Sequence, residues 1–270
     1  MKKKFTLAIS NLAWSPQEDT DALTYVANSG ISSLEISPFR TTADLTVISP
    51  AFAKTYARQI SLYKLQIIAL QALLFRFPNL LIFQDKENRE QTFAHLCHVI
   101  EFAHAVGAKS LIFGSPKNKI RGKMKYAEAF AIAVDFFGRI AAVAAKNSVT
   151  FCIEPTPSVY GTDFLRDTKE SIALISAVDN EALKLNVDLG ALQLNKEDLQ
   201  EILPNNLPHV GYIHISEPYL KPIHRDYAFH EGAAQIILTS GYSGTVSIEM
   251  LPQPLQDIKK TLSFVTAVYI

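Results

Sequence analysis

Short apolar runs that stop at turn residues or ionisable groups recur along the whole chain. Each run has the length of a buried strand, and each precedes a longer stretch with helical spacing of its apolar residues. The strands are expected at residues 5–10, 33–36, 65–70, 110–113, 149–153, 183–187, 210–213 and 245–248. The helices are expected at residues 19–28, 50–63, 88–106, 126–146, 168–178, 196–203, 231–239 and 254–268.

This regular alternation predicts an α/β protein with parallel strands and right-handed crossovers. Eight strand–helix units fit a closed (β/α)8 TIM barrel, and the 270 residues fit a single domain over residues 1–270. An open doubly wound sheet is the alternative. Residues 10–15 lack the glycine-rich turn of dinucleotide-binding folds, so no nucleotide cofactor is expected.

Four of the apolar strands end at a group that can bind a metal or move a proton. These groups are Glu154, Asp188, His214 and Glu249, and the active face of a (β/α)8 barrel lies at the carboxyl ends of its strands. Taken alone, each group is more simply explained as a partner in a salt bridge or as a loop cap than as a metal ligand. Three carboxylates brought together repel one another and lose hydration. Their convergence therefore predicts a divalent cation, Mn2+ or Mg2+, with Co2+ or Zn2+ as substitutes.

Composition narrows the classes of function. The formal net charge is zero, so the basic face of a nucleic-acid-binding protein is not expected. Cys97 and Cys152 lack metal or redox spacing, which predicts free thiols. The apolar run after Lys2–Lys4 is too short for a secretory signal, and no run approaches the roughly 20 apolar residues of a membrane span. A soluble cytoplasmic protein without a membrane partner is expected, and a homo-oligomer stays open.

The same strand ends carry motifs that resemble a known family. The motifs are Ile-Glu-Pro at 153–155, Asn-Val-Asp at 186–188, His-Ile-Ser-Glu-Pro at 214–218 and Ser-Ile-Glu-Met at 247–250, together with Leu34-Glu35-Ile36, Phe113-Gly114-Ser115 and Gly241-Tyr242. In order and spacing they resemble the xylose-isomerase-like TIM barrel superfamily. This is the sugar phosphate isomerase/epimerase group, which includes ketose 3-epimerases, and the similarity extends over essentially the whole chain.

The resemblance implies that Glu154, Asp188, His214 and Glu249 hold one divalent metal, and that Glu154 and Glu249 also move protons. A metal chelated by a carbonyl and a neighbouring hydroxyl acidifies the adjacent C–H and stabilises the enediolate. Two carboxylates on opposite faces can then invert a carbon without a redox cofactor. The expected function is a metal-dependent isomerase or epimerase of a sugar or sugar-like ketone, and the expected partner is a small carbohydrate-like substrate.

Three positions depart from the ketose epimerases of this group. Those enzymes typically have a second glutamate six residues after the first, a histidine three residues after the metal aspartate, and often an arginine three residues after the glutamate of HxSE. Here these positions are Tyr160, Ala191 and Leu220. In the family these groups hold substrate oxygens near the reacting carbon, so the resemblance supports the metal centre better than the substrate.

Glu217, Trp14, Lys117 and His230 are candidate substrate-binding residues. Glu217 lies in the HISE motif and either contacts substrate or supports His214, but an ordinary ion pair with Lys221 fits equally well. Trp14 follows the first strand and either walls the substrate or packs in the core.

The other two candidates have simpler alternatives. Lys117 opens a basic loop with Lys119, Arg121 and Lys123, which either binds a substrate phosphate or carboxylate or is simply solvated. For His230, as for His224, a helix cap or a surface position is favoured over ligation.

Three other functions stay open at this point. A dehydratase of a keto-polyol or keto acid shares the enolisation step. An endonuclease at abasic sites belongs to the same superfamily, but its multi-metal site is richer in histidine. A non-catalytic binding barrel is disfavoured because both glutamates are present.

Overall fold

A closed parallel barrel forms the centre of the computed structural model, which describes residues 5–44, 48–223 and 227–269. Within these residues the strands pair in chain order, and the last strand pairs with the first. The strands are β1 (Thr6–Ser10), β2 (Ser33–Ile36), β3 (Gln66–Leu70), β4 (Ser110–Phe113), β5 (Thr150–Ile153), β6 (Leu183–Asp188), β7 (Val210–Ile215) and β8 (Thr245–Ile248). The predicted (β/α)8 barrel is confirmed.

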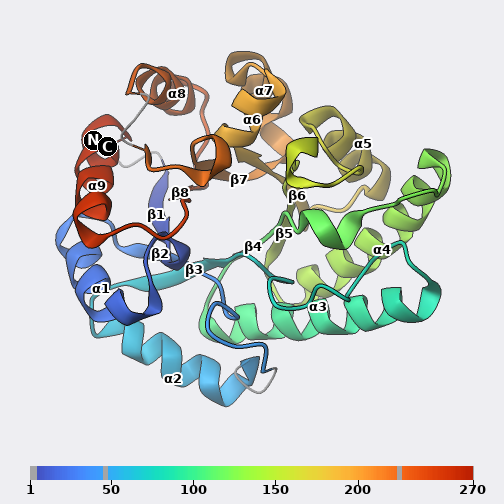
Figure 1. The fold of residues 1–270 in the computed structure, drawn as a ribbon, viewed down its shortest axis with the longest axis horizontal. Coiled ribbons are helices and arrows are strands. Elements are labelled where there is room, and N and C mark those ends of the chain that lie inside the picture. The colour runs from blue at the N-terminus through green and yellow to red at the C-terminus, as the bar shows by residue number, and fades with distance from the viewer. Residues whose placement is uncertain (1–4, 45–47, 224–226, 270) are drawn as a thin grey trace.

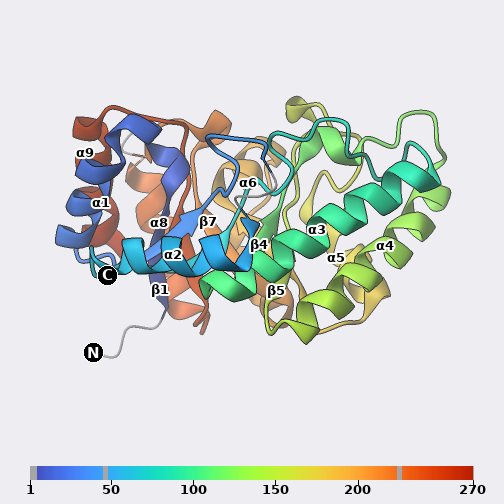
Figure 2. The same cartoon turned by 90° about the horizontal axis from the view of Figure 1, so that it is seen from below.

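Helices form an outer ring around the strands (Figure 1), and Figure 2 shows α2 and α3 lying along the side of the barrel. The helices are α1 (Asp19–Asn28), α2 (Pro50–Ser61), α3 (Lys86–Val106), α4 (Tyr126–Lys146), α5 (Thr168–Val178), α6 (Leu189–Asn195), α7 (Leu199–Asn206), α8 (Tyr227–Thr239) and α9 (Leu255–Tyr269). Short 3-10 helices occupy Asn11–Ala13, Pro16–Glu18, Pro116–Lys119, Ser158–Tyr160, Leu207–His209 and Pro218–Leu220. α9 packs against α1, which closes the ring.

Two features of the described chain agree with simple expectations. Cys97 and Cys152 are free thiols, as predicted. Among the helices of the described segments, none combines the length and the apolar character needed to cross a membrane.

Aromatic side chains fill the layer between the strands and the helices. Phe113 of β4 lies edge-on to Phe137 of α4 at 5.4 Å between ring centroids, and Phe151 of β5 lies 5.7 Å from Phe113. All three side chains are fully buried. This packing of α4 against β4 and β5 fixes the strands whose ends carry part of the candidate site.

The helix predicted at residues 196–203 is displaced: it forms as α7 from Leu199 to Asn206. A helix that was not predicted, α6, comes directly after β6, and Lys196 adopts a left-handed conformation (φ 58°) between the two. The reason is local capping. The carboxylate of Asp188 accepts a hydrogen bond from the backbone N–H of Ala191, so the helix begins at once, and Asp198 caps α7 in the same way.

β7 also extends beyond its predicted end. It runs to Ile215, so His214 lies inside the strand rather than after it, and Asp188 and His214 are register partners on β6 and β7. The two side chains therefore start from neighbouring positions on the same face of the sheet.

Removing the Phe137 ring tests the packing of this layer. Phe137→Ala should lower the free energy of unfolding by about 3–5 kcal/mol, because it leaves a cavity beneath β4 and β5. Urea unfolding followed by circular dichroism measures this change. Phe52→Ala is the control, because Phe52 is 41% exposed on α2. Equal losses for the two variants would contradict the packing described here.

Candidate metal centre and active site

The alternation of side chains along a strand directs the candidate site residues into the barrel. Residues two apart share a face, so Glu154 faces the same side as Cys152, and His214 the same side as Tyr212. Cys152 and Tyr212 pack together with Ala69 and Ile112 in a separate buried cluster. Glu154 and His214 therefore lie one layer above this apolar plug, at the carboxyl ends of the strands.

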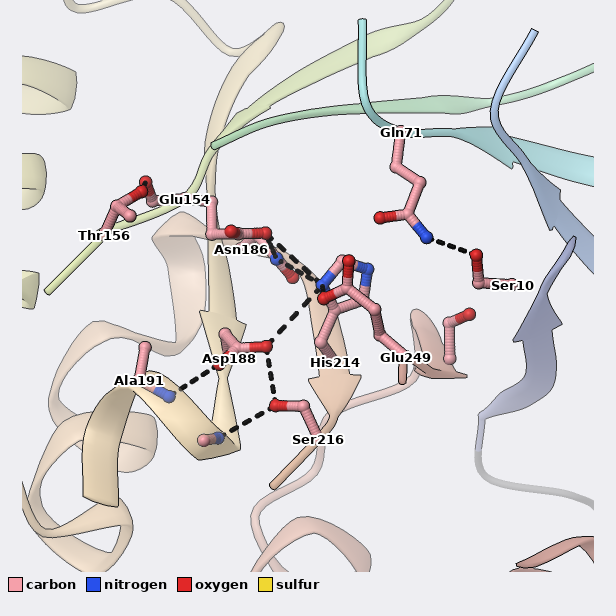
Figure 3. Close-up of polar contacts among 12 residues, drawn as sticks. Ser10, Gln71, Glu154, Thr156, Asn186, Asp188, Ala191, His214, Ser216 and Glu249 are labelled. Atoms are coloured by element: carbon pink, nitrogen blue, oxygen red, sulfur yellow. Dashed lines mark hydrogen bonds and ion pairs between the residues drawn. The ribbon is translucent and has the colours of Figure 1, made fainter. Parts of the chain in front are cut away.

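Three carboxylates converge on one nitrogen of His214 (Figure 3). Its Nδ1 lies 3.0 Å from Oε2 of Glu249, 3.3 Å from Oε2 of Glu154 and 3.8 Å from Oδ2 of Asp188. One potential ligand atom from each of Glu154, His214 and Glu249 lies within 4.8 Å of the others. The structure thus brings all four predicted metal ligands together, with Asp188 at the edge of the triad formed by the other three.

Asp188 is held by two short hydrogen bonds. Oδ1 accepts from the backbone N–H of Ala191 at 2.6 Å, and Oδ2 accepts from the hydroxyl of Ser216 at 2.6 Å. Ser216 Oγ in turn accepts from the N–H of Gly190 at 2.9 Å. A Cβ on Gly190 would lie 2.7 Å from the carbonyl of Glu217, so only glycine allows this close approach of α6 and the segment after β7.

Glu35 supports His214 from the opposite side. Nε2 of His214 lies 3.1 Å from both carboxylate oxygens of Glu35, which also accepts a hydrogen bond from Ser247 Oγ at 2.8 Å. A carboxylate on the far nitrogen of a ligating histidine fixes the ring and its tautomer. Sequence reasoning gave Glu35 no role, although an acid inside a buried strand requires a polar partner.

Sequence reasoning also missed Asn186, and it left Lys119 either at a substrate anion or in solvent. Asn186 Nδ2 donates to Oε2 of Glu154 at 2.8 Å and lies 3.1 Å from Nδ1 of His214. Its place two residues before Asp188, on the same face of β6, was the available signal. The fully buried Lys119 instead donates from Nζ to the carbonyl of Glu154 at 3.1 Å and to Thr156 Oγ1 at 3.0 Å.

Burial and neighbouring charges shift the pKa values of the cluster's acids in different directions. Burial raises the pKa of Glu249 to about 7 against the opposing effect of His214, and the charges of Glu154 and Asp188 add to the rise. Burial and the charge of Glu154 raise the pKa of Asp188 to about 6. Burial also acts to raise the pKa of Glu154, but the hydrogen bond and charge of His214, with Lys119 and Asn186, bring it below its ordinary value.

The basic groups respond to the same environment. Burial lowers the pKa of Lys119 to about 7, although the charges of Glu154 and Glu170 oppose the change. Burial acts to lower the pKa of His214, but the charges of Glu35 and Glu249 and the hydrogen bonds with Glu154 and Glu249 raise it well above its usual value. A cation bound here would compete with the protons that these raised pKa values favour.

A cavity of about 490 Å3 opens above the cluster. It is lined by Leu12, Gln71, Ala72, Leu74, Phe75, Pro78, Ile112, Gly114, Ser115, Pro116, Lys117, Asn118, Glu154, Pro155, Thr156, Pro157, Tyr160, Asp188, Ala191, Leu220 and Glu249. Three of the four cluster residues, Glu154, Asp188 and Glu249, thus line one cavity. This size suits a small-molecule ligand.

The structure separates the four candidate substrate-binding residues. Lys117 lines the cavity, whereas Trp14 is buried and donates from Nε1 to Asp19 at 2.7 Å, away from the lining. Glu217 and His230 are buried as a pair, with Oε1 3.4 Å from Nε2, and neither is among the lining residues.

The surface or cap position favoured for His230 is therefore wrong. Nδ1 of His230 lies 3.2 Å from the hydroxyl of Tyr269, because α8 packs its inner face against α9. The alternative expected for Glu217 was an ion pair with Lys221, but Glu217 contacts His230. Lys221 lies over the ring of Tyr219. His224 lies outside the described residues.

The basic loop does not gather its cations at the cavity. Lys119 points to the backbone of Glu154, and the guanidinium of Arg121 donates to the carbonyl of Met124 at 2.7 Å. The backbone N–H of Arg121 donates to Asp163 at 2.8 Å, which fixes the loop against the segment after β5. Of the four basic residues of the loop, Lys117 lines the cavity.

Gly114 leaves room for the carboxylate of Glu154, and its replacement tests that placement. A Cβ on Gly114 would lie 2.6 Å from Oε1 of Glu154. Gly114→Ala should therefore displace Glu154 and weaken Mn2+ binding by about 10-fold or more. Calorimetric titration with Mn2+ measures this. Gly138→Ala is the control, because a Cβ there meets nothing closer than 4.0 Å; unchanged affinity in Gly114→Ala would refute the placement.

The pKa shifts predict how Mn2+ binding depends on pH. At about pH 6 Glu249 is mostly protonated and Asp188 about half protonated, whereas at about pH 8 both are ionised. Protons compete with the cation at the lower pH, so Mn2+ should raise the Tm more at the higher pH. Thermal unfolding with and without Mn2+ measures the two increments. A larger increment at the lower pH would contradict the shifts.

Comparisons with known proteins agree with this architecture. The family described as "Xylose isomerase-like TIM barrel" matches residues 23–268. Similar solved structures include 3-keto-D-glucoside 4-epimerase from E. coli, with 15% identity, 97% of this chain and 99% of that chain covered, and a TM-score of 0.79. D-allulose 3-epimerase from Methylomonas sp. has 17% identity, with 99% of this chain and 98% of that chain covered, and a TM-score of 0.78. AP endonuclease, family 2, from Brucella melitensis has 16% identity, with 97% of this chain and 99% of that chain covered, and a TM-score of 0.73.

At these identities the structural similarity concerns the fold, and no curated protein matches the sequence. The family match, in contrast, extends over most of the chain and includes all four strand ends of the cluster. The chain belongs to the family of xylose isomerase-like TIM barrels.

Proposed function

We propose that this protein is a divalent-metal-dependent isomerase or epimerase that moves a proton on a sugar or sugar-like ketone. The observation that carries the proposal is the meeting of Glu154 and Glu249 in the lining of the cavity, where both approach Nδ1 of His214. Both contact that nitrogen, at 3.3 and 3.0 Å. The similarity to sugar epimerase structures supports the same class of reaction.

The residues present fit a divalent cation. Glu154, His214 and Glu249 offer two carboxylate oxygens and one imidazole nitrogen within 4.8 Å, and Asp188 adds a third carboxylate at their edge. Such a donor set suits Mn2+ or Mg2+, and it also accepts Co2+ or Zn2+. A cation held there would polarise the substrate carbonyl and balance the charge of the acids.

The two glutamates are suited to opposite halves of a proton transfer. The pKa of Glu154 is lowered, which favours the ionised form that can accept a proton from carbon. Glu249, at the end of β8, is the second carboxylate of the pair and can return a proton to the carbon. Placed on two faces of the carbon next to the carbonyl, they would remove a proton from one side and return one from the other.

The supporting groups keep this pair in place during the reaction. Asn186 and the Lys119 ammonium hold the side chain and the backbone of Glu154, respectively. Glu35 keeps Nδ1 of His214 directed at the centre.

Replacing each glutamate by glutamine tests the mechanism. Glu154→Gln and Glu249→Gln preserve shape but remove the base, so each should lower turnover by about 100-fold or more at saturating Mn2+. A panel of ketoses, inososes and keto acids in D2O, read by mass spectrometry, identifies an exchanging substrate. Glu128→Gln on the exposed face of α4 is the control. Parent-like turnover in both site variants would exclude the mechanism.

A further inference from the structure

The cavity wall beside Asp188 and Glu249 is apolar. It is made by Tyr160 from the 3-10 helix after β5, Ala191 of α6, and Leu220 from the 3-10 helix after β7. The N–H of Ala191 is bonded to Asp188, and the carbonyl of Leu220 accepts from the N–H of Leu251, two residues beyond Glu249. This wall therefore lies next to the carboxylates at which the substrate would react.

The polar groups on this side of the cavity already take part in hydrogen bonds within the protein. The hydroxyl of Tyr160 accepts from the backbone N–H of Tyr219 at 2.9 Å, and the Tyr160 ring lies edge-on to Tyr219 at 6.0 Å. Thr156 Oγ1 accepts from Lys119 and lies 3.3 Å from the carbonyl of Glu154. Both carboxylate oxygens of Asp188 already accept hydrogen bonds.

Polar side chains line the other side of the cavity. Gln71 follows β3, and Ser115 and Lys117 follow β4. Figure 3 shows Gln71 on the far side of His214 and Glu249 from Asp188. The β3 and β4 side of the cavity thus offers polar side chains among apolar ones such as Leu74 and Phe75, whereas the wall of Tyr160, Ala191 and Leu220 offers one polar group, the Tyr160 hydroxyl.

We propose that the ketone substrate carries an apolar group, a methyl or an unsubstituted methylene carbon, on the side of its carbonyl that faces Tyr160, Ala191 and Leu220. Its hydroxyls lie toward Gln71 and Lys117. A hydroxyl against the side chains of Ala191 and Leu220 would lose its water without gaining a partner. The proposal rests on the proposed function, because it takes the carboxylate cluster as the reacting centre.

Hydroxyacetone and dihydroxyacetone form an achiral pair of probes that differ by this one hydroxyl. Each keeps a carbonyl and a neighbouring hydroxyl, so each can react at the same carbon. The Mn2+-loaded protein should bind hydroxyacetone about 10- to 100-fold more tightly, because apolar sites reject an added hydroxyl by at most about 100-fold. Calorimetry measures binding, and mass spectrometry in D2O measures deuterium uptake. A larger pair, 1-deoxy-D-fructose and D-fructose, fills more of the cavity.

Leu220→Arg should reduce or reverse the preference, because a guanidinium can bond the added hydroxyl. The left-handed backbone at Leu220 (φ 52°) accepts arginine no worse than leucine, since both have a Cβ. Leu62→Arg is the matched control, because Leu62 is 83% exposed after α2, and it should keep the parent preference.

The outcomes separate this inference from the proposed function. Equal or tighter binding of the hydroxylated member of both pairs, or no binding of any probe, would overturn the inference. A parent-like preference in Leu220→Arg would also overturn it. Selective binding of the deoxy probes without deuterium uptake would support the apolar wall and contradict the proposed proton transfer.

Discussion

Three carboxylates share the space around one imidazole nitrogen, and the surrounding structure has to hold that concentration of charge in place. Nδ1 of His214 lies within 3.8 Å of Glu154, Asp188 and Glu249, and all of these side chains are largely withdrawn from water. Like charges at such distances destabilise one another when they are buried. Burial and this repulsion raise the pKa values of Asp188 and Glu249, and a bound cation or bound protons relieve the repulsion.

The neighbouring residues position or balance these crowded charges. Glu35 balances His214 from beneath, so the imidazole is held between carboxylates on both of its nitrogens. Lys119 brings an ammonium to the end of β5 without competing for the carboxylate of Glu154, because it bonds the backbone carbonyl. Gly114 provides the space that the carboxylate of Glu154 occupies. Each of these groups acts on position or charge and lies outside the ligand triad.

The barrel and the four strand-end residues were predictable from the sequence, because both follow from local signals. An apolar run that ends at an acid identifies a strand and its tip, and the barrel topology places successive tips at one mouth. The support for His214 was not predictable in the same way. Glu35 lies 179 positions away in the chain and meets His214 only across the closed barrel. The burial of Trp14 and His230 likewise depends on packing between α-helical and loop segments that no local pattern encodes.

The apolar wall affects the charged centre because it limits the contact of the acids with water. Tyr160, Ala191 and Leu220 keep solvent away from Asp188 and Glu249, and burial is the largest cause of the raised pKa of both acids. The same wall offers few partners to a hydroxyl group. A polar wall would hold more substrate oxygens, but it would also hydrate the acids and bring their pKa values closer to those in water. If Glu249 moves a proton as proposed, substrate preference and the protonation of this glutamate depend on the same side chains, and a change in one is expected to alter the other.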